Sequence, residues 1–226
     1  MRWLVVAVLL LVWSGAQAET LDLYFLRHAQ TMANVTRTYT EENQQTFSRW
    51  GRDQVEAVPE KLAGIEFDVV IVSPAWRTQH TILPVLQERG IQAEIWPEIY
   101  ECCWDRETEE DEPALVQGER IVIEEDLQDH FQFRDDESVY MYDVDTPARG
   151  ELMVERAVDL VRTRFSGTDK TILLVSHYHT GARILTALLD EPPDRPIRPA
   201  NARLTHLQQD PDGRFRLLRL NDQTVE

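Results

Sequence analysis

Three short apolar runs, at residues 23–26, 67–72 and 171–175, restrict the fold of this chain more than any other feature of its sequence. Each run is too short for a typical helix and contains almost no polar residue, which is typical of parallel strands that helices cover on both faces. The sequence therefore predicts an α/β fold. The polar residues at or just after the ends of the three runs are Arg27 and His28, Ser73 and Arg77, and Ser176 and His177.

The carboxyl ends of parallel strands lie at one edge of a sheet, and ligands of open α/β sheets bind there. Two arginines and two histidines would meet at this edge and form a pocket for an anion. The planar fork of an arginine matches the oxygens of a phosphate group, and a neutral imidazole has a nucleophilic nitrogen. These residue types predict chemistry on a phosphoryl group, with His28 as the candidate nucleophile.

The motifs resemble those of the histidine phosphatase superfamily, in its phosphoglycerate-mutase-like branch. Residues 27–31, Arg-His-Ala-Gln-Thr, are similar to the Arg-His-Gly-Glu/Gln-Thr signature of that family, and Asn34 lies where the branch usually has asparagine. Residues 73–81 resemble the motif Ser-Pro-x-x-Arg-x-x-x-Thr, and residues 176–177 resemble the closing Ser/Ala-His-Gly. The resemblance extends over residues 21–222. It implies a three-layer α/β/α fold with a mostly parallel central sheet.

Two positions depart from the family pattern. Ala29 replaces the usual glycine of the first motif, and Tyr178 replaces the glycine that follows the second histidine. Neither change removes a chemical group that the reaction needs. The bulkier Tyr178 is expected either to narrow the phosphate pocket or to contact the substrate.

The resemblance also implies a mechanism. His28 would attack phosphorus and form a phosphohistidine, which water then hydrolyses. Cationic and hydrogen-bonding groups would neutralise the equatorial oxygens of the transferred group, so that neither a metal ion nor another cofactor is implied. The residues implied to bind the phosphoryl group are Arg27, Thr31, Asn34, Arg77 and His177.

A carboxylic acid should protonate the leaving oxygen, and the resemblance offers two glutamates for this role. Residues 93–101 are similar to the family's strand followed by Pro-x-Leu-x-Glu, which selects Glu101 as the proton donor. In another register, residues 102–105 match the family's Gly-x-Trp-Glu, which selects Glu98. Ile99 fills the apolar position two residues before Glu101, and Glu101 is therefore the preferred assignment.

The amino terminus has the pattern of a secretory signal peptide. A basic start at residues 1–2 precedes an apolar stretch at 3–13, and residues 14–18 end in Ala-Gln-Ala. This pattern predicts cleavage after Ala18 and export to the periplasm or the exterior. The apolar stretch is shorter than the ~20 residues that a membrane span requires, so no stable membrane anchor is expected.

Residues 19–226 are long enough for one α/β domain with a sizeable core. Within it, the strongly acidic stretch 104–150 corresponds to the region that caps the active site in this family. A lid that selects the substrate and a solvated acidic loop both remain open for it. Near the end, Asp-Pro-Asp-Gly at 210–213 predicts a hairpin between residues 203–208 and 214–220. Helices are expected after Ser48, Arg77, Pro147 and Thr180.

The composition limits the partners of this chain. It has 40 acidic and 23 basic residues and a net charge of −17, which argues against binding to nucleic acids or anionic membranes. Its two cysteines, Cys102 and Cys103, are adjacent, and their Cα atoms lie ~3.8 Å apart across a trans peptide, below the usual range for a disulfide. Packing residues, a bridge within or between chains, and a redox switch beside Glu101 remain open.

These features favour an exported, metal-independent phosphatase that acts on a small-molecule phosphomonoester. A phosphomutase of the same family is the nearest alternative, and export argues against it. A catalytically silent module that only binds phosphate is the other alternative, and Tyr178 keeps it open. The sequence determines neither the substrate nor the oligomeric state.

Overall fold

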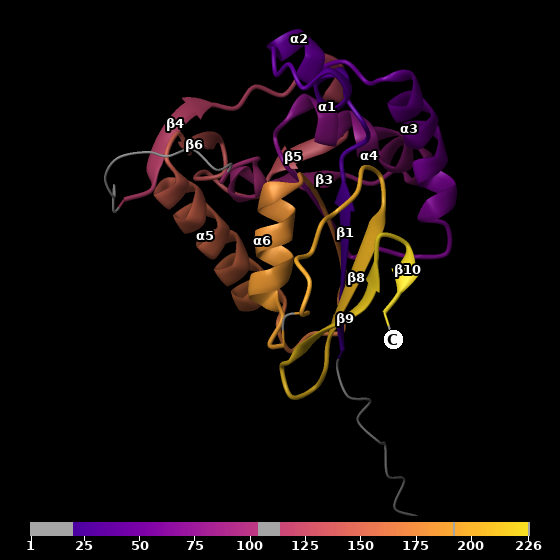
Figure 1. Cartoon of the computed structure of the whole chain (residues 1–226), viewed down its shortest axis with the longest axis vertical. Helices are drawn as coiled ribbons and strands as arrows, with labels where there is room; N and C mark the ends of the chain where they lie inside the picture. Colours follow the sequence, from indigo (N-terminus) through magenta and orange to yellow (C-terminus); the bar gives the residue numbers. More distant parts are fainter. Residues whose placement is uncertain (1–19, 104–113, 192, 226) are drawn as a thin grey trace, which may run out of the picture.

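An eight-stranded sheet runs through the centre of the computed structural model, which describes residues 20–103, 114–191 and 193–225 (Figure 1). Its strand order is β10-β9-β8-β1-β7-β2-β3-β5, and β4 and β6 form a separate small sheet. The strands are β1 (Leu21–Arg27), β2 (Val69–Val72), β3 (Ala93–Ile95), β4 (Val116–Arg120), β5 (Phe131–Phe133), β6 (Tyr140–Asp143), β7 (Thr171–Ser176), β8 (Leu204–Gln209), β9 (Phe215–Leu220) and β10 (Gln223–Thr224). The helices are α1 (Met32–Thr36), α2 (Glu41–Gln44), α3 (Arg49–Lys61), α4 (Trp76–Arg89), α5 (Pro147–Phe165) and α6 (His179–Leu188), with 3-10 turns η1 (Pro97–Ile99) and η2 (Glu125–Leu127).

The pairing of β1, β7 and β2 brings the three motifs to one edge of the sheet. These strands are parallel, and Arg27 lies opposite Ser176 in the β1–β7 pair. The N–H of His28 donates to the Ser176 carbonyl at 3.0 Å, and the N–H of Ser73 donates to the Val175 carbonyl at 3.0 Å. The predicted convergence of the three strand ends is therefore confirmed.

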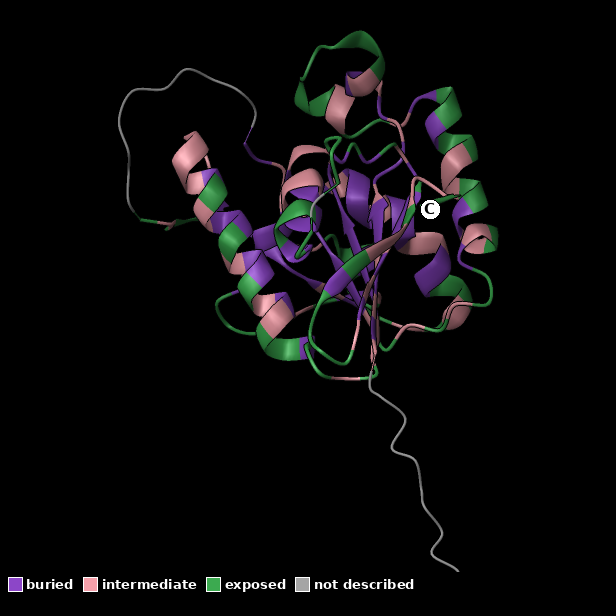
Figure 2. Cartoon of the chain, turned by 60° about the horizontal axis from the view of Figure 1, so that its bottom comes forward, coloured by how far each residue is buried: buried purple, intermediate pink, exposed green. Residues whose placement is uncertain are grey.

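Alternate residues of β1 enter two separate apolar clusters. Phe25 packs in the cluster beneath α5 and α6, whereas Leu26 packs in the cluster beneath α3 and α4. Helices therefore cover both faces of the sheet, and Figure 2 shows the buried residues concentrated between these layers. The predicted α/β/α architecture with a mostly parallel sheet is confirmed, since β8, β9 and β10 run antiparallel at one side of five parallel strands.

The helices begin close to the expected positions. Ser48 caps α3, because its Oγ accepts the N–H of Gly51 at 2.9 Å. The helix α4 begins at Trp76, one residue before Arg77, and α5 begins at Pro147, as expected. The predicted hairpin at the carboxyl end is confirmed by the antiparallel pair of β8 and β9.

The acidic stretch 104–150 divides into parts with different surroundings. Residues 104–113 lie outside the described part of the chain. The rest includes β4 and β6, which pair with each other, and β5, which joins the main sheet beside β3. This stretch therefore contributes a strand to the core of the domain. Within the described ranges, none of the helices has the length and apolar character needed to span a membrane.

Candidate active site

His28 lies directly after β1 and is only 2% exposed. Its Nδ1 is 2.8 Å from the Ala29 carbonyl oxygen. A carbonyl can only accept, so Nδ1 carries the hydrogen and Nε2 keeps its lone pair. Burial lowers the pKa of His28 well below its usual range, and the charges of Arg77 and Arg27 lower it further. His28 is therefore a neutral imidazole with a nucleophilic nitrogen.

His177 lies beside His28, with 5.4 Å between the ring centroids. Its Nε2 is 2.7 Å from the Ser73 hydroxyl. The Ser73 hydroxyl accepts the N–H of Ala75 at 3.4 Å and can at the same time donate its own proton to His177 Nε2. With that direction of the bond, the hydrogen of His177 is on Nδ1, which is buried and has no partner among the described residues. Burial lowers the pKa of His177 as well, so it is a neutral donor.

Arg27 is the last residue of β1 and is held from two sides. Its Nη1 donates to the Pro199 carbonyl at 3.0 Å, and its guanidinium carbon lies 5.0 Å from the centroid of the Tyr178 ring. Tyr178 thus places its bulk against this arginine. Burial lowers the pKa of Arg27, and the charge of Glu101 acts in the opposite direction. The Nε of Arg27 is buried and unpaired within the described residues.

Arg77 lies in the first turn of α4 and is 8% exposed. Its Nη1 donates to Gln44 Oε1 at 3.4 Å, which connects α4 to α2. Burial lowers the pKa of Arg77, while Tyr100 and Glu101 act to raise it. A guanidinium stays protonated in proteins, so both arginines supply a fixed positive charge beside His28.

Glu101 is tied to the amino terminus of α6, immediately after His177. Its carboxylate accepts the backbone N–H groups of Tyr178 at 3.2 Å, His179 at 3.0 Å and Thr180 at 3.3 Å. The positive end of a helix dipole favours a negative group there. Glu101 therefore lies within the electrostatic reach of both arginines and next to the second histidine.

Glu98, the alternative proton donor, has a different environment. It is fully buried, and both its oxygens accept from Arg134 at 3.0 Å. Arg156 Nε and the Tyr142 hydroxyl lie 3.4 Å from Glu98 Oε1. None of these partners belongs to the three motifs, whereas the charge of Glu101 acts on both Arg27 and Arg77. The geometry favours Glu101 as the acid, and the assignment remains a prediction.

Thr31 and Asn34 form the capping box of α1. Thr31 Oγ1 accepts the N–H of Asn34 at 3.4 Å, and Asn34 Oδ1 accepts the N–H of Thr31 at 3.1 Å. The amide of Asn201 donates both to Asn34 Oδ1 at 3.3 Å and to the His28 carbonyl at 2.9 Å. These contacts give Thr31 and Asn34 a role in fixing the loop after His28, and the predicted contacts with phosphate stay untested.

The structure adds residues that the sequence did not indicate. Gln44 and Tyr100 contact Arg77, and Asn201 holds the loop that carries His28. They come from α2, from the segment after η1 and from the loop before β8. No local pattern connects these segments, so the contacts depend on the tertiary fold.

Cys102 and Cys103 form a disulfide between adjacent residues. Both are buried, at 0% and 4% exposure, and belong to the apolar cluster beneath α5 and α6. Of the options that the sequence left open, the structure has the bridge within the chain. It directly follows Glu101.

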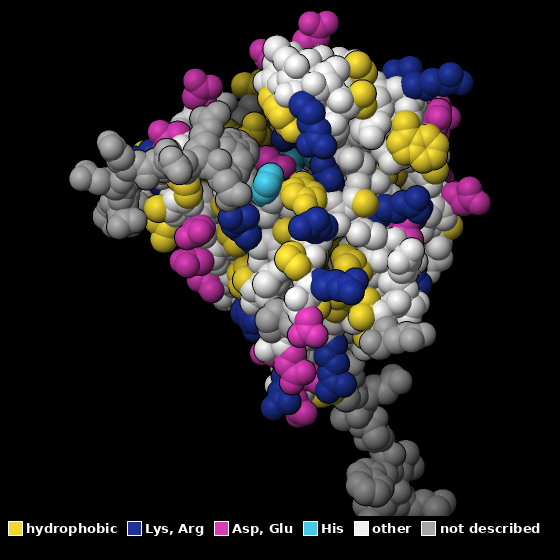
Figure 3. All heavy atoms as spheres, viewed as in Figure 1, with side chains coloured by type: hydrophobic (Ala, Val, Ile, Leu, Met, Phe, Trp, Pro, Cys, Tyr) yellow, Lys and Arg dark blue, Asp and Glu magenta, His cyan; other side chains and the backbone are white. Residues whose placement is uncertain are grey.

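The surface around this site combines opposite charges. Figure 3 shows histidine and acidic side chains beside lysine or arginine side chains in a hollow below α2.

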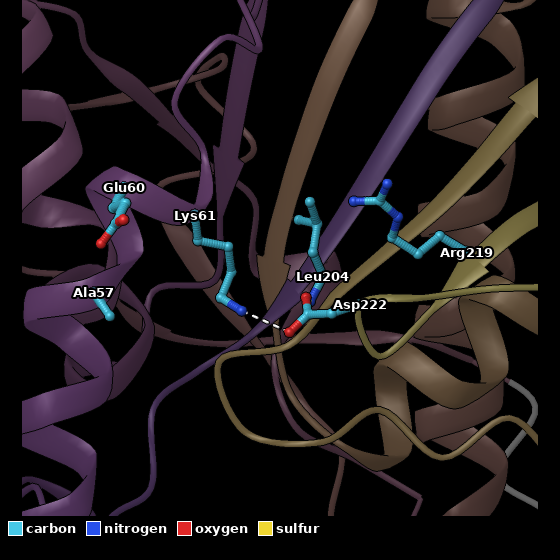
Figure 4. A pocket seen from close by; sticks show the side chains of 6 residues that line it. All are labelled: Ala57, Glu60, Lys61, Leu204, Arg219 and Asp222. Carbon is cyan, nitrogen blue, oxygen red and sulfur yellow. Dashed lines mark hydrogen bonds and ion pairs between the residues drawn. The ribbon is translucent and has the colours of Figure 1, made fainter.

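A shallow pocket lies elsewhere on the domain and contains no residue of the three motifs (Figure 4). It is lined by Ala57, Glu60, Lys61, Leu204, Arg219 and Asp222. There the Lys61 ammonium pairs with the Asp222 carboxylate at 2.6 Å, so these two charges satisfy each other.

A family model described as the histidine phosphatase superfamily (branch 1) matches residues 23–223. The chain therefore belongs to the histidine phosphatase superfamily. The resemblance that the motifs carry is confirmed, and it now extends over nearly all of the described residues.

Several of the proteins that this chain is similar to are named as phosphatases. The chain is 25% identical over 175 residues to the adenosylcobalamin/alpha-ribazole phosphatase of Escherichia coli (strain K12), with 75% of this chain and 80% of that protein covered. It superposes on the alpha-ribazole phosphatase from Shigella flexneri with a TM-score of 0.60 at 20% identity, covering 91% of this chain and 99% of the other. For a mycobacterial glucosyl-3-phosphoglycerate phosphatase in complex with VO3 the TM-score is 0.55 at 21% identity, covering 88% and 98%.

Proposed function

We propose that this protein hydrolyses phosphomonoesters through a phosphohistidine formed on His28. The observation that carries the proposal is the state of that imidazole. It is neutral, its Nδ1 hydrogen is bonded to the Ala29 carbonyl, and burial together with the charges of Arg77 and Arg27 lowers its pKa. A nucleophile needs a free lone pair, and a phosphoryl group needs nearby cations; His28 with Arg27 and Arg77 meets both requirements.

In the first step His28 Nε2 attacks phosphorus, and the bond from phosphorus to the ester oxygen breaks. Charge on the equatorial oxygens is balanced by the two arginines and by the Nδ1–H of His177. The leaving oxygen takes a proton from the carboxylic acid of Glu101. The products are the free alcohol and His28 phosphorylated on Nε2.

In the second step a water molecule attacks the phosphohistidine. The Glu101 carboxylate, which gave its proton in the first step, accepts one from this water. The bond from nitrogen to phosphorus breaks, inorganic phosphate leaves, and His28 returns to its neutral state. Each proton is accounted for, and the arginines supply the positive charge that other phosphatases obtain from metal ions. We therefore propose a metal-independent reaction on a small-molecule phosphoester.

We further propose that the protein is exported after cleavage behind Ala18. The residues 1–18 support this through their basic start, apolar stretch and small residues before the cleavage position. The disulfide of Cys102 and Cys103 adds support, because disulfides persist mainly in oxidising compartments. Fractionation of the native host, with mass determination of the mature amino terminus, tests this part.

The test of the catalytic proposal uses p-nitrophenyl phosphate, the chain without residues 1–18, and EDTA in the assay. We expect turnover by the parent and none by His28→Ala. Rapid acid-free quenching during turnover of a radiolabelled substrate should trap label on His28, and the label should be lost at low pH as phosphohistidines are.

The other outcomes separate the alternatives. Transfer of the label to a second hydroxyl of the substrate, with little free phosphate, would indicate a phosphomutase. Binding of inorganic phosphate without turnover of any ester would indicate a silent binding module. Loss of activity in EDTA that added metal restores would overturn the metal-independent mechanism.

A further inference from the structure

We propose that the disulfide of Cys102 and Cys103 positions the Glu101 carboxyl, so that opening this bond slows the reaction of esters with poor leaving groups. The proposal rests on the role of Glu101 in the proposed function. Cys102 directly follows Glu101 in the chain. These are the chain's two cysteines, so any effect of a thiol reagent on covalent structure arises at this bond.

Residues 100–102 are hydrogen-bonded to Thr180 in the first turn of α6. The N–H of Cys102 donates to Thr180 Oγ1 at 3.0 Å, and this hydroxyl donates to the Tyr100 carbonyl at 2.6 Å. The N–H of Thr180 in turn donates to Glu101 Oε1 at 3.3 Å. A displacement of Cys102 would therefore change the position of the Glu101 carboxylate relative to the helix that follows His177.

On the side of α5 the disulfide packs against the backbone of Gly150. Cys102 Sγ lies 3.5 Å from the Gly150 carbonyl oxygen. On the other side, Cys102 Sγ lies 3.4 Å from Thr180 Oγ1. Two sulfurs that no longer share a bond of about 2 Å must separate to a van der Waals distance of roughly 3.5–4 Å. Because their neighbours are close, the backbone of Cys102 and Glu101 has to move.

The backbone at Cys103 points to the same conclusion. Its φ is 63°, a left-handed conformation that is unfavourable for a residue with a side chain. The short covalent ring restrains this conformation, and its opening would remove that restraint. Cys103 could then adopt a more favourable backbone conformation, and the segment from Glu101 to Cys103 would move away from α6.

A dithiol opens the bond in two exchange steps. One thiolate attacks a protein sulfur and forms a mixed disulfide, and the second thiol of the reagent closes its own disulfide and releases the protein thiolate. The protein gains two hydrogen atoms and the reagent loses two. Mass spectrometry after alkylation of the free thiols measures the extent of the reaction.

The test compares kcat/KM for two kinds of ester in the oxidised and reduced protein. An alkyl phosphate such as glycerol 2-phosphate needs a proton on its leaving oxygen, whereas p-nitrophenolate leaves as a stable anion. We expect reduction to lower kcat/KM for the alkyl ester on the order of 10–100-fold, as for a misplacement near 1 Å, and to change that for the aryl ester by less than about threefold. Reoxidation should restore both values.

Two variants keep this test independent of the proposed function. Glu101→Gln should show the same selective loss for the alkyl ester, by roughly 10²–10⁴-fold. If it does not, the assignment of the acid is wrong. If it does, while the reduced protein keeps both rates or loses both in parallel, the role of the disulfide is wrong.

The double variant Cys102→Ser with Cys103→Ser is the control for the reagent. It should resemble the reduced protein and should not respond to the dithiol, and a response would overturn the proposal. Thermal unfolding checks that each protein is folded. If the variant does not fold, the comparison uses the parent refolded in the dithiol, whose thiols are counted before the assay.

Discussion

Glu98 and Arg134 form a two-point ion pair in which Nη1 donates to Oε2 and Nη2 donates to Oε1, both at 3.0 Å. The Glu98 side chain has no exposed surface, and that of Arg134 is 8% exposed. The two residues come from η1 and from the end of β5, so the pair fixes the acidic stretch to the core of the domain. Although burial lowers the pKa of Arg134, its bonds to Glu98 and Asp135 raise it by more. The pair is buried and joins two distant segments, which is a structural role.

Glu98→Gln should therefore lower the free energy of unfolding, but it should not cause the selective loss of alkyl ester hydrolysis that removal of the catalytic acid would cause. The amide keeps the size of the side chain but leaves Arg134 and Arg156 without their buried counter-charge. Removal of one partner of a buried pair costs about 3 kcal/mol or more, and urea unfolding measures it. The ratio of kcat/KM for aryl and alkyl phosphates should equal that of the parent. A selective loss with the alkyl ester would make Glu98 the acid after all.

Ser73→Ala should reduce catalysis through His177. The hydroxyl holds that imidazole in place by its bond to Nε2 at 2.7 Å. Loss of a buried hydrogen bond of 1–3 kcal/mol predicts a fall in kcat/KM of roughly 5–150-fold. Ser138→Ala is the matched control, because Ser138 is equally buried and bonds only within its own turn. It should leave kcat/KM unchanged, and an equal fall in both variants would contradict the role of Ser73.

The lowered pKa of His28 should appear in the pH dependence of stability. The unfolded chain protonates this histidine near pH 6.5, whereas the folded protein does so only at lower pH. The unfolded state thus binds more protons below about pH 6.5, and stability is lost as the pH falls, by up to 1.36 kcal/mol per pH unit for this group, roughly. Acidic groups with lowered pKa values, such as Asp68 and Asp222, also contribute stability that the protein loses as the pH falls.

The contribution of His28 is isolated by comparison with His28→Gln. Denaturant unfolding between pH 7 and 5 should give a shallower loss of stability for this variant, because the acidic groups are common to both proteins. Parallel curves would show that His28 titrates normally in the folded state.

Gly51→Ala should disturb the contact between α3 and the loop after His28. A Cβ at this position would lie 1.9 Å from the Gln30 carbonyl oxygen, and a backbone atom cannot move aside alone. We expect a loss of about 3 kcal/mol in unfolding free energy. Gly118→Ala is the control, since its Cβ would meet nothing nearer than Met141 O at 3.4 Å; it should change stability by less than about 0.5 kcal/mol.

Tyr178→Leu should weaken the binding of phosphate, whereas Tyr178→Phe should not. The ring lies 5.0 Å from the Arg27 guanidinium, and such a contact contributes about 0.5–2 kcal/mol. Leucine removes the ring, so the inhibition constant for inorganic phosphate should rise by roughly 2–30-fold. Phenylalanine keeps it. A stronger effect of Phe than of Leu would show that the hydroxyl, and not the stacking, matters.

Much of the fold could be predicted because it depends on local patterns. The runs that became β1, β2 and β7 are apolar on both sides, and the turn at 210–213 has a strong signal, so the parallel strands and the closing hairpin followed directly. Arg27, His28, Arg77 and His177 lie at strand ends or in the turn beyond, where topology leaves little freedom. Their meeting at one edge follows from the parallel order alone.

The sequence could not distinguish Glu98 from Glu101 in this way, because the two lie three residues apart in the same acidic segment. What separates them is the partner that each meets. Arg134 and Arg156 approach Glu98 from 36 and 58 residues away, and the amino terminus of α6 approaches Glu101 from 77 residues away. The state of Cys102 and Cys103 likewise depends on how α5 and α6 pack around them.

The sequence by itself therefore determined the class of fold, the edge at which the candidate site lies and the four residues that we propose carry its chemistry. Where a strand forms and where it ends are local properties, because they depend on consecutive residues. Only the tertiary structure decided which carboxylate is paired with arginines, which hydroxyl contacts His177 and whether the cysteines are bonded. Those outcomes depend on burial and on partners distant in the chain, which no local pattern specifies.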